Sequence, residues 1–101
     1  NSMTDNTRIY ISGKITGTTD YISRFNKSEI EMINQGYEVV NPATMLDHLP
    51  TSATHKEYMH VSYALLDICD GIYMMDGWQN SVGAVLEYGY ALDKGLVILY
   101  E

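Results

Sequence analysis

Glu87 is an acid within a stretch of small and apolar residues, DGWQNSVGAVLEYGYA (residues 76–91). In a helix that begins after Ser81, Glu87 lies nearly two turns inside, with Gly83 four positions before it and Ala91 four positions after it. Residues four apart share a helix face, so these small residues leave a hollow beside the carboxylate where a ligand could approach. A partly buried carboxylate pays a desolvation cost, and such sites are often functional. The alternative is an acid that faces solvent.

Several other kinds of site have no support in the sequence. The three histidines, His48, His55 and His60, do not form a metal-ligand spacing with an acidic or cysteine cluster, so no zinc site is predicted. Neither a Walker-type phosphate loop nor a dinucleotide G-x-G-x-x-G motif is present, so no cofactor is expected. Cys69 is the single cysteine and ends an apolar helical run, which favours a small buried side chain over a reactive thiol.

Length and charge narrow the class of protein. The 101 residues are enough for one domain, expected to span residues 1–101, with Asn1 and Ser2 resembling an expression remnant. The formal net charge of -7 argues against binding of nucleic-acid polymers, but a small phosphate ligand remains compatible with it. The chain has no run of about 18 apolar residues, and its first eight residues lack the apolar core of a signal peptide. With one cysteine, a reducing cytoplasm is expected.

Four short runs rich in β-branched and aromatic residues are typical of strands. They are Arg8–Gly13, Tyr37–Val40, Gly71–Met75 and Leu96–Tyr100. Their nearly continuous apolar character indicates a parallel sheet that is covered on both faces. Strands that alternate with helices also predict parallel pairing through right-handed crossovers.

Three helices are predicted between the strands. The first is capped by Thr19 or Asp20 and runs to about Gln35, and apolar spacing predicts its inward residues as Ile22, Phe25, Ile30 and Ile33. A short turn near Met45 precedes the second helix, from about Lys56 to Ile68, with Met59, Tyr63 and Leu66 inward and Leu65 as a further candidate. The third is capped by Ser81 and runs to about Leu92, and Gly95 closes it.

Ligands of parallel α/β sheets bind beyond the carboxyl ends of the strands. This rule selects three segments of the chain, Gly13–Thr19, Asn41–Ala43 and Asp76–Ser81. The last of them leads directly into the helix that carries Glu87. The sequence therefore predicts a site at this edge of the sheet.

Four segments that follow one another along the chain carry a family resemblance: IYISGKITG, VVNPA, CDGIYMMDGW and SVGAVLEYGYAL. Together they resemble the nucleoside 2-deoxyribosyltransferase-like superfamily, and in particular a small, often phage-encoded branch of unknown function with a GW…S.GA..E signature. The resemblance spans about residues 8–100. It implies a flavodoxin-like or Rossmann-like three-layer sandwich, with a four-stranded parallel sheet in the order 2-1-3-4.

The resemblance assigns chemistry to individual positions. In the superfamily the glutamate of this helix attacks C1′ of a deoxynucleoside, releases the base and forms a glycosyl-enzyme, and that role falls on Glu87. A strand-one tyrosine often orients the nucleophile, and Tyr10 matches it, although a packed core residue is the alternative. Gly13 and Gly17 match a glycine loop that lets a ligand approach the backbone. Lys14, where the family commonly has proline, could contact an anion or remain solvated.

Two departures from the family pattern affect the expected activity. Where transferases usually carry an aspartate, this chain has Ser81, preceded by Asn80; related hydrolases of deoxynucleoside 5′-monophosphates carry serine there, near the phosphate. Ser81 would then contact phosphate, cap the helix, or both. The acid that assists the leaving base is also absent, since its position falls on Ser62 or its neighbour His60.

Other residues near the strand ends have weaker assignments. Asp76, or a side chain of a neighbouring subunit, could supply the missing acid. Trp78 could stack on a nucleobase or be buried at a subunit interface. Asp67 and Asp70 are expected to act locally, at the turn between helix and strand.

The sequence thus predicts cleavage or transfer at the N-glycosidic bond of a (deoxy)nucleoside or its 5′-monophosphate, with a slight preference for hydrolysis. The alternatives are a binding protein for nucleotide derivatives that lacks catalysis, and a phage interaction module. The expected partner is a small molecule, with no membrane and no nucleic-acid polymer. A homodimer or larger homo-oligomer is also expected, because the fourth strand lies at the edge of a sheet that usually has a fifth.

Overall fold

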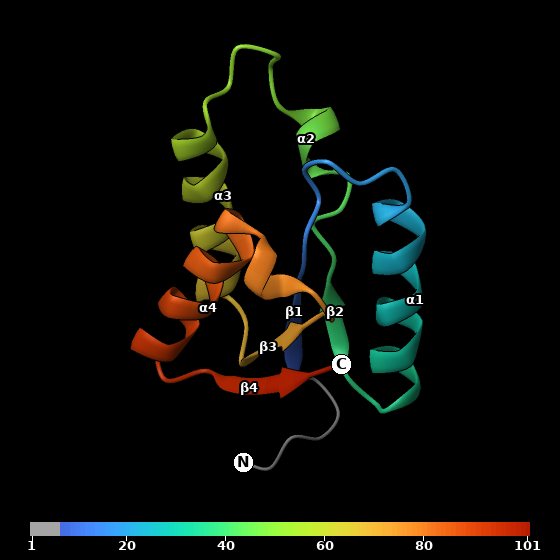
Figure 1. The fold of residues 1–101 in the computed structure, drawn as a ribbon. Coiled ribbons are helices and arrows are strands. Elements are labelled where there is room, and N and C mark those ends of the chain that lie inside the picture. The colour runs from blue at the N-terminus through green and yellow to red at the C-terminus, as the bar shows by residue number, and fades with distance from the viewer. Residues whose placement is uncertain (1–6) are drawn as a thin grey trace.

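The computed structural model describes residues 7–101, so the suggested expression remnant at residues 1–2 lies outside the described residues. Strands and helices alternate along the chain, as Figure 1 shows. The elements are β1 (Arg8–Ser12), α1 (Tyr21–Asn34), β2 (Glu38–Val40), α2 (Met45–His48), α3 (His55–Asp67), β3 (Gly71–Met74), a 3-10 turn (Trp78–Asn80), α4 (Val82–Asp93) and β4 (Val97–Tyr100). Each long element predicted from the sequence lies within one residue of its expected bounds.

The four strands form one parallel sheet in the order β2-β1-β3-β4, which confirms the predicted flavodoxin-like arrangement. Helix α1 covers one face of the sheet, and α3 and α4 cover the other (Figure 1). Strand β1 lies between β2 and β3, and Tyr10 is paired with Val40 on one side and Ile72 on the other. The centre of the sheet is therefore the most enclosed part of the molecule.

Side chains of β1 alternate between two apolar clusters, because successive residues of a strand point to opposite faces. Ile9 and Ile11 join the cluster under α1, together with Phe25. Tyr10 joins the cluster under α3 and α4. Ser12, two residues after Tyr10, shares that second face. The alternation thus directs two hydroxyl groups from one strand toward α4.

The predicted inward face of α1 is wrong except at one position. Ile22, Ile30 and Ile33 are 40%, 59% and 52% exposed. The buried residues of this helix are Phe25, Ser28 and Met32. These three are spaced by three and four positions and form one face, with a serine in the middle that apolar spacing alone does not select. The small Ser28 and the flexible Met32 bring this face against the sheet, and the isoleucines lie beside it.

Helix α3 begins one residue earlier than predicted, because Thr54 caps it with a complete capping box. The Glu57 backbone amide donates to Thr54 Oγ1 at 3.1 Å, and the Thr54 backbone amide donates to Glu57 Oε1 at 2.8 Å. This reciprocal pair fixes His55 as the first residue of the helix. The buried face holds Met59, Leu66 and Ser62.

Helix α4 begins as predicted, since Ser81 Oγ accepts a hydrogen bond of 3.1 Å from the Ala84 backbone amide. Gly95 follows its end with a φ of 73°, a conformation that glycine adopts readily. Within residues 7–101, none of the helices combines the length and the apolar character needed to cross a membrane.

Candidate functional site

Glu87 lies on the buried face of α4, together with Ala84 and Ala91. The three residues are spaced by three and four positions. Ala84 and Ala91 pack in the apolar cluster with residues of β1 and β3, and Glu87 bonds to β1. Only 5% of Glu87 is exposed. The solvent-facing alternative for this acid is therefore excluded, and its small neighbours allow the helix to approach the sheet.

Two hydroxyl groups of β1 hold the two oxygens of the Glu87 carboxylate. Tyr10 Oη donates to Oε2 at 2.7 Å, and Ser12 Oγ donates to Oε1 at 2.6 Å. Both donors are buried, and such short bonds to an ionised acceptor are stronger than bonds between neutral groups. None of the ion pairs found within residues 7–101 involves Glu87, so hydroxyl groups provide its observed stabilisation.

Burial raises the pKa of the Glu87 carboxyl above its ordinary value, and the hydroxyls of Ser12, Tyr10 and Ser62 partly oppose this by favouring the charged form. Burial and the negative charge of Glu87 also hold the pKa of Tyr10 well above its usual range, so its phenol stays a proton-bearing donor. The fully buried Ser62 hydroxyl has no hydrogen-bond partner of good geometry among residues 7–101.

A cavity of about 130 Å³ opens beside Glu87 at the carboxyl edge of the sheet. Each of the three segments selected by the strand-end rule contributes to its wall. The lining residues are Ile11, Gly13, Ile15, Thr16, Phe25, Pro42, Leu46, Ala53, Thr54, His55, Tyr58, Ser81, Gly83, Ala84 and Glu87. The cavity thus combines apolar walls with several polar groups, and such concave sites suit small molecules.

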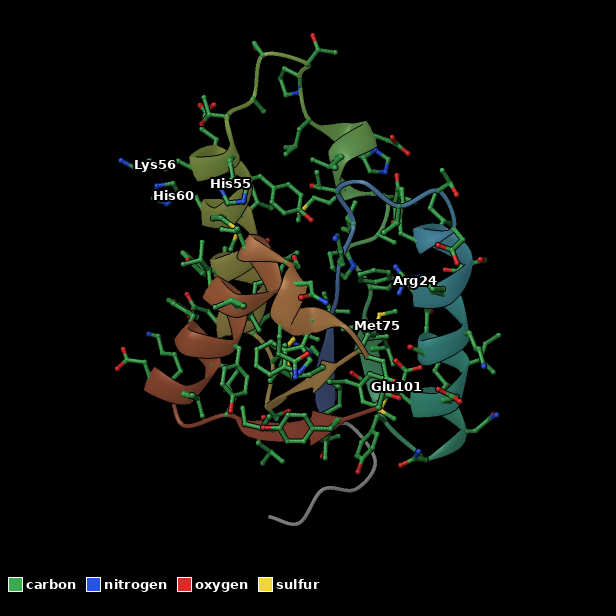
Figure 2. The ribbon with its side chains drawn as sticks, viewed as in Figure 1. Arg24, His55, Lys56, His60, Met75 and Glu101 are labelled. Atoms are coloured by element: carbon green, nitrogen blue, oxygen red, sulfur yellow. The ribbon has the colours of Figure 1, made fainter. Side chains whose placement is uncertain are left out.

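The first turn of α3 places two further titratable side chains at the cavity, His55 and Tyr58. A methyl group added to Gly83 would lie 3.8 Å from His55 Nε2, so the imidazole lies directly over this glycine. Burial, followed by the charge of Glu87, raises the pKa of Tyr58 far above its ordinary value. Figure 2 shows His55 on the inner side of α3, whereas Lys56 and His60 project away from the molecule.

Four of the residues predicted from the sequence line the cavity: Gly13, Ser81, Gly83 and Glu87. Tyr10 lies behind Glu87 and reaches the site through it. A Cβ atom on Gly13 would come within 2.9 Å of Met75 Sδ, so the absence of a side chain there allows close packing of the strand end.

The other five predicted residues lie outside the cavity wall. Lys14 contributes its backbone carbonyl to a 3.0 Å bond from Arg24, and Gly17 forms a turn with a φ of 79°. Asp76 and Asn80 are exposed. The Trp78 ring packs against Tyr88, with 4.5 Å between ring centroids, so its contact in the folded chain is internal.

A family model described as Domain of unknown function (DUF4406) matches residues 7–100. The chain belongs to the DUF4406 family. No curated protein matches this DUF4406 chain. A solved structure, named 2-desoxiribosyltransferase from Leishmania mexicana, is similar to it with a TM-score of 0.69 and 19% sequence identity. The similarity covers 93% of this chain and 63% of that one, so the DUF4406 chain spans less than two thirds of that enzyme and shares its fold.

Polar residues of this site that were not predicted individually from the sequence are Ser12, Thr16, Thr54, His55 and Tyr58. Ser12 had a usable signal, because a strand residue two positions after Tyr10 faces the same side. In the sequence, His55 is a candidate only for a metal site, and no pattern selects Tyr58. The position of His55 and Tyr58 at the cavity depends on where α3 begins, which the Thr54 capping box sets.

Proposed function

We propose that this chain cleaves or transfers at the N-glycosidic bond of a (deoxy)nucleoside or its 5′-monophosphate, with Glu87 as the nucleophile. One observation carries the proposal: a buried carboxylate is held at both oxygens by Tyr10 and Ser12 and lines a cavity at the carboxyl edge of the sheet. The fold shared with a protein named as a 2-desoxiribosyltransferase supports the same chemistry.

The geometry suits an attack on a sugar carbon. The two hydroxyls fix the plane of the carboxylate, so the nucleophile loses little freedom when a sugar binds. Burial disfavours the free charge, and an oxocarbenium-like centre at C1′ would offset that cost as the charges approach each other. The bond from a Glu87 oxygen to C1′ forms as the bond from C1′ to the base breaks, and water or a second base then releases the sugar.

Substrate contacts in this proposal come from the residues that line the cavity. Gly13 and Ser81 stand at the ends of the loops that follow β1 and β3, where sugar or phosphate oxygens would lie. Ser81 also precedes the first amides of α4, and a helix N-terminus favours an anion. Serine at this position keeps the slight preference for hydrolysis over transfer.

A panel of deoxynucleosides, ribonucleosides and their 5′-monophosphates tests the proposal. Incubation with the wild-type protein should release free base from at least one compound, as measured by chromatography. Glu87→Ala, which removes the nucleophile, should release none. Absence of turnover across the panel, or undiminished turnover by Glu87→Ala, would reject the proposed chemistry.

A second function, binding of a nucleotide derivative without catalysis, is favoured by one observation. Among the residues that line the cavity, Glu87 is the only carboxylic acid. A binding protein would gain thermal stability with compounds of the same panel, and mass analysis would recover them unchanged. Detection of free base in the recovered material would show catalysis and would reject binding alone.

Substitution of Gly83 should separate binding from folding. A Cβ atom here would meet Met59 Sδ at 3.7 Å, His55 Nε2 at 3.8 Å and Ser81 Oγ at 3.9 Å, which are ordinary contacts. Gly83→Ala should therefore fold, with up to about 1 kcal/mol of added helix stability. Gly83→Leu should extend into the cavity and reduce turnover strongly.

Turnover and melting temperature of both Gly83 variants provide the measurement. Gly89 offers the control, since it lies on the same helix and a Cβ atom there would meet nothing within 4 Å. Gly89→Leu should leave turnover unchanged. Equal activity of Gly83→Leu and the wild type would show that substrate does not use this cavity.

A further inference from the structure

The cavity contains titratable side chains besides Glu87. N-glycosidic bond chemistry, on which this inference rests, needs a nucleophile and, for most bases, a proton donor for the departing base. Three titratable side chains line the cavity, Glu87, Tyr58 and His55. Glu87 is committed to the nucleophilic role, so the donor must be sought between the other two.

Tyr58 is a poor proton donor. Burial and the nearby Glu87 charge raise its pKa, so its phenol holds the proton tightly at neutral pH and acts only as a hydrogen-bonding group. Histidine differs from tyrosine in this respect, because the free imidazole side chain gains and loses a proton near neutrality. The chemistry of the cavity wall therefore selects His55.

The position of His55 relative to Glu87 suits a leaving base. Nε2 lies 3.8 Å from the place of a Cβ atom on Gly83. Gly83 precedes Glu87 by four residues on the same face of α4, which is a rise of about 5.4–6 Å along the helix. The imidazole and the carboxylate thus face one hollow from two ends. A sugar with C1′ at Glu87 would direct its base along the hollow toward His55.

His55 is a solvent-exposed residue that also lines the cavity. The Thr54 capping box holds the start of α3, and Glu57 is engaged with Thr54 in that box. Lys56 and His60 project to the other side of the helix (Figure 2). The titratable groups that share the cavity with His55 are therefore Glu87 from α4 and Tyr58 from α3.

We infer that His55 is the general acid that protonates the departing base. A Glu87 oxygen bonds to C1′ while the bond from C1′ to the base breaks, and its electron pair goes to the base. The proton on Nε2 passes to a ring nitrogen or carbonyl oxygen of the base, leaving a glycosyl ester, a neutral base and a neutral imidazole. Water then attacks C1′ and gives its proton to His55, which restores the carboxylate and the imidazolium.

Matched leaving groups test this role. 2′-Deoxyguanosine needs protonation to release guanine, whereas N7-methyl-2′-deoxyguanosine already carries a positive base. 2′-Deoxyuridine and 5-fluoro-2′-deoxyuridine form a second pair, in which the fluorinated base leaves more easily. Each compound is assayed as nucleoside and as 5′-monophosphate with the wild type, His55→Ala, His55→Gln and the control His60→Ala, whose side chain lies on the same helix but projects outward.

We expect His55→Ala and His55→Gln to lose about 10²-fold or more in kcat/KM on the unmodified nucleoside that the wild type cleaves. On the methylated substrate the same variants should have nearly the wild-type rate. On the fluorinated substrate they should lose much less activity than on 2′-deoxyuridine. His60→Ala should match the wild type on all compounds.

The contrary outcomes are distinct. An equal loss on both members of a pair, or no loss on either, overturns the role of His55 and leaves the nucleophile untouched. The melting temperatures of the variants show whether an equal loss comes from unfolding. Cleavage of none of the compounds by the wild type overturns the proposed function, and the role of His55 with it.

Discussion

Glu87→Gln is expected to abolish base release and to raise the melting temperature at neutral pH. Glutamine keeps the size of the side chain, and its carbonyl oxygen still accepts from Tyr10 while its amide donates to the Ser12 hydroxyl. The nucleophilic oxygen is lost, and so is a buried charge. Active-site residues often lower the stability of the fold in return for activity, and removing them then raises stability.

The pH dependence of this gain follows from the direction of the pKa shift. Burial raises the pKa of Glu87 in the folded chain above its unfolded value, so folding favours the protonated form. The stability that the protonated Glu87 carboxyl contributes is fully present below the pKa of the unfolded chain, and it is lost as the pH rises through the pKa of the folded chain. Glutamine mimics the protonated form at every pH. The variant should therefore match the wild type in acid and be more stable at neutral pH.

Thermal unfolding between pH 4 and pH 8 measures the effect, and for a chain of this size about 1 kcal/mol shifts the melting temperature by about 4–8 °C. Glu57→Gln is the control with the opposite sign. The backbone amide and the side chain of Thr54 lower the pKa of Glu57, so its charge supports the helix above the unfolded pKa. A lower melting temperature for Glu87→Gln at neutral pH would contradict the expected cost of the buried charge.

The second large effect is expected from Tyr10→Phe and Ser12→Ala, alone and together. Each substitution removes a hydroxyl that lowers the pKa of Glu87, so the carboxylate becomes protonated at a higher pH. The acid limb of the pH-rate profile should therefore shift to higher pH in each variant, and the shift should be largest in the double variant. Loss of one hydrogen bond to a charged group costs about 1.5–3 kcal/mol, or about 10- to 100-fold in rate at fixed pH.

Ser28→Ala is the matched control for Ser12→Ala. Ser28 is as buried as Ser12, but it lies on α1, against the other face of the sheet. Ser28→Ala should leave the acid limb of the pH-rate profile at its wild-type pH. An acid limb that stays fixed in the double variant would mean that a group other than Glu87 sets it.

The elements of the sheet could be predicted from the sequence, because short apolar runs, turn residues and helix caps all agree on the same alternation of strands and helices. The strand order followed from the family resemblance. The sequence also located Glu87, since small residues on both sides of an acid indicate a buried helix face. It failed on α1, where docking depends on Ser28 and Met32 more than on the isoleucines. Trp78 stays a prediction as a base contact; in the folded chain its ring packs on Tyr88.

The polar parts of the site were harder to predict because they depend on tertiary contacts. Ser12 reaches Glu87 only because β1 and α4 pack together. His55 faces the cavity because its helix begins where the Thr54 capping box sets it. The first relation joins residues 75 positions apart and is not visible as a spacing in one segment. The capping box is a local T-x-x-E spacing, but the cavity that His55 lines is formed by residues from distant segments.

The hydrogen bonds of Glu87 span nearly the whole chain, from the first strand to the last helix. They join Glu87 to residues 77 and 75 positions away. Contacts between such distant residues form only after a long loop has closed, and that closure slows folding. The buried carboxylate is therefore satisfied only when both ends of the fold are in place. Enzymatic turnover would then serve as a direct assay of completed folding, because partly folded chains would show no turnover.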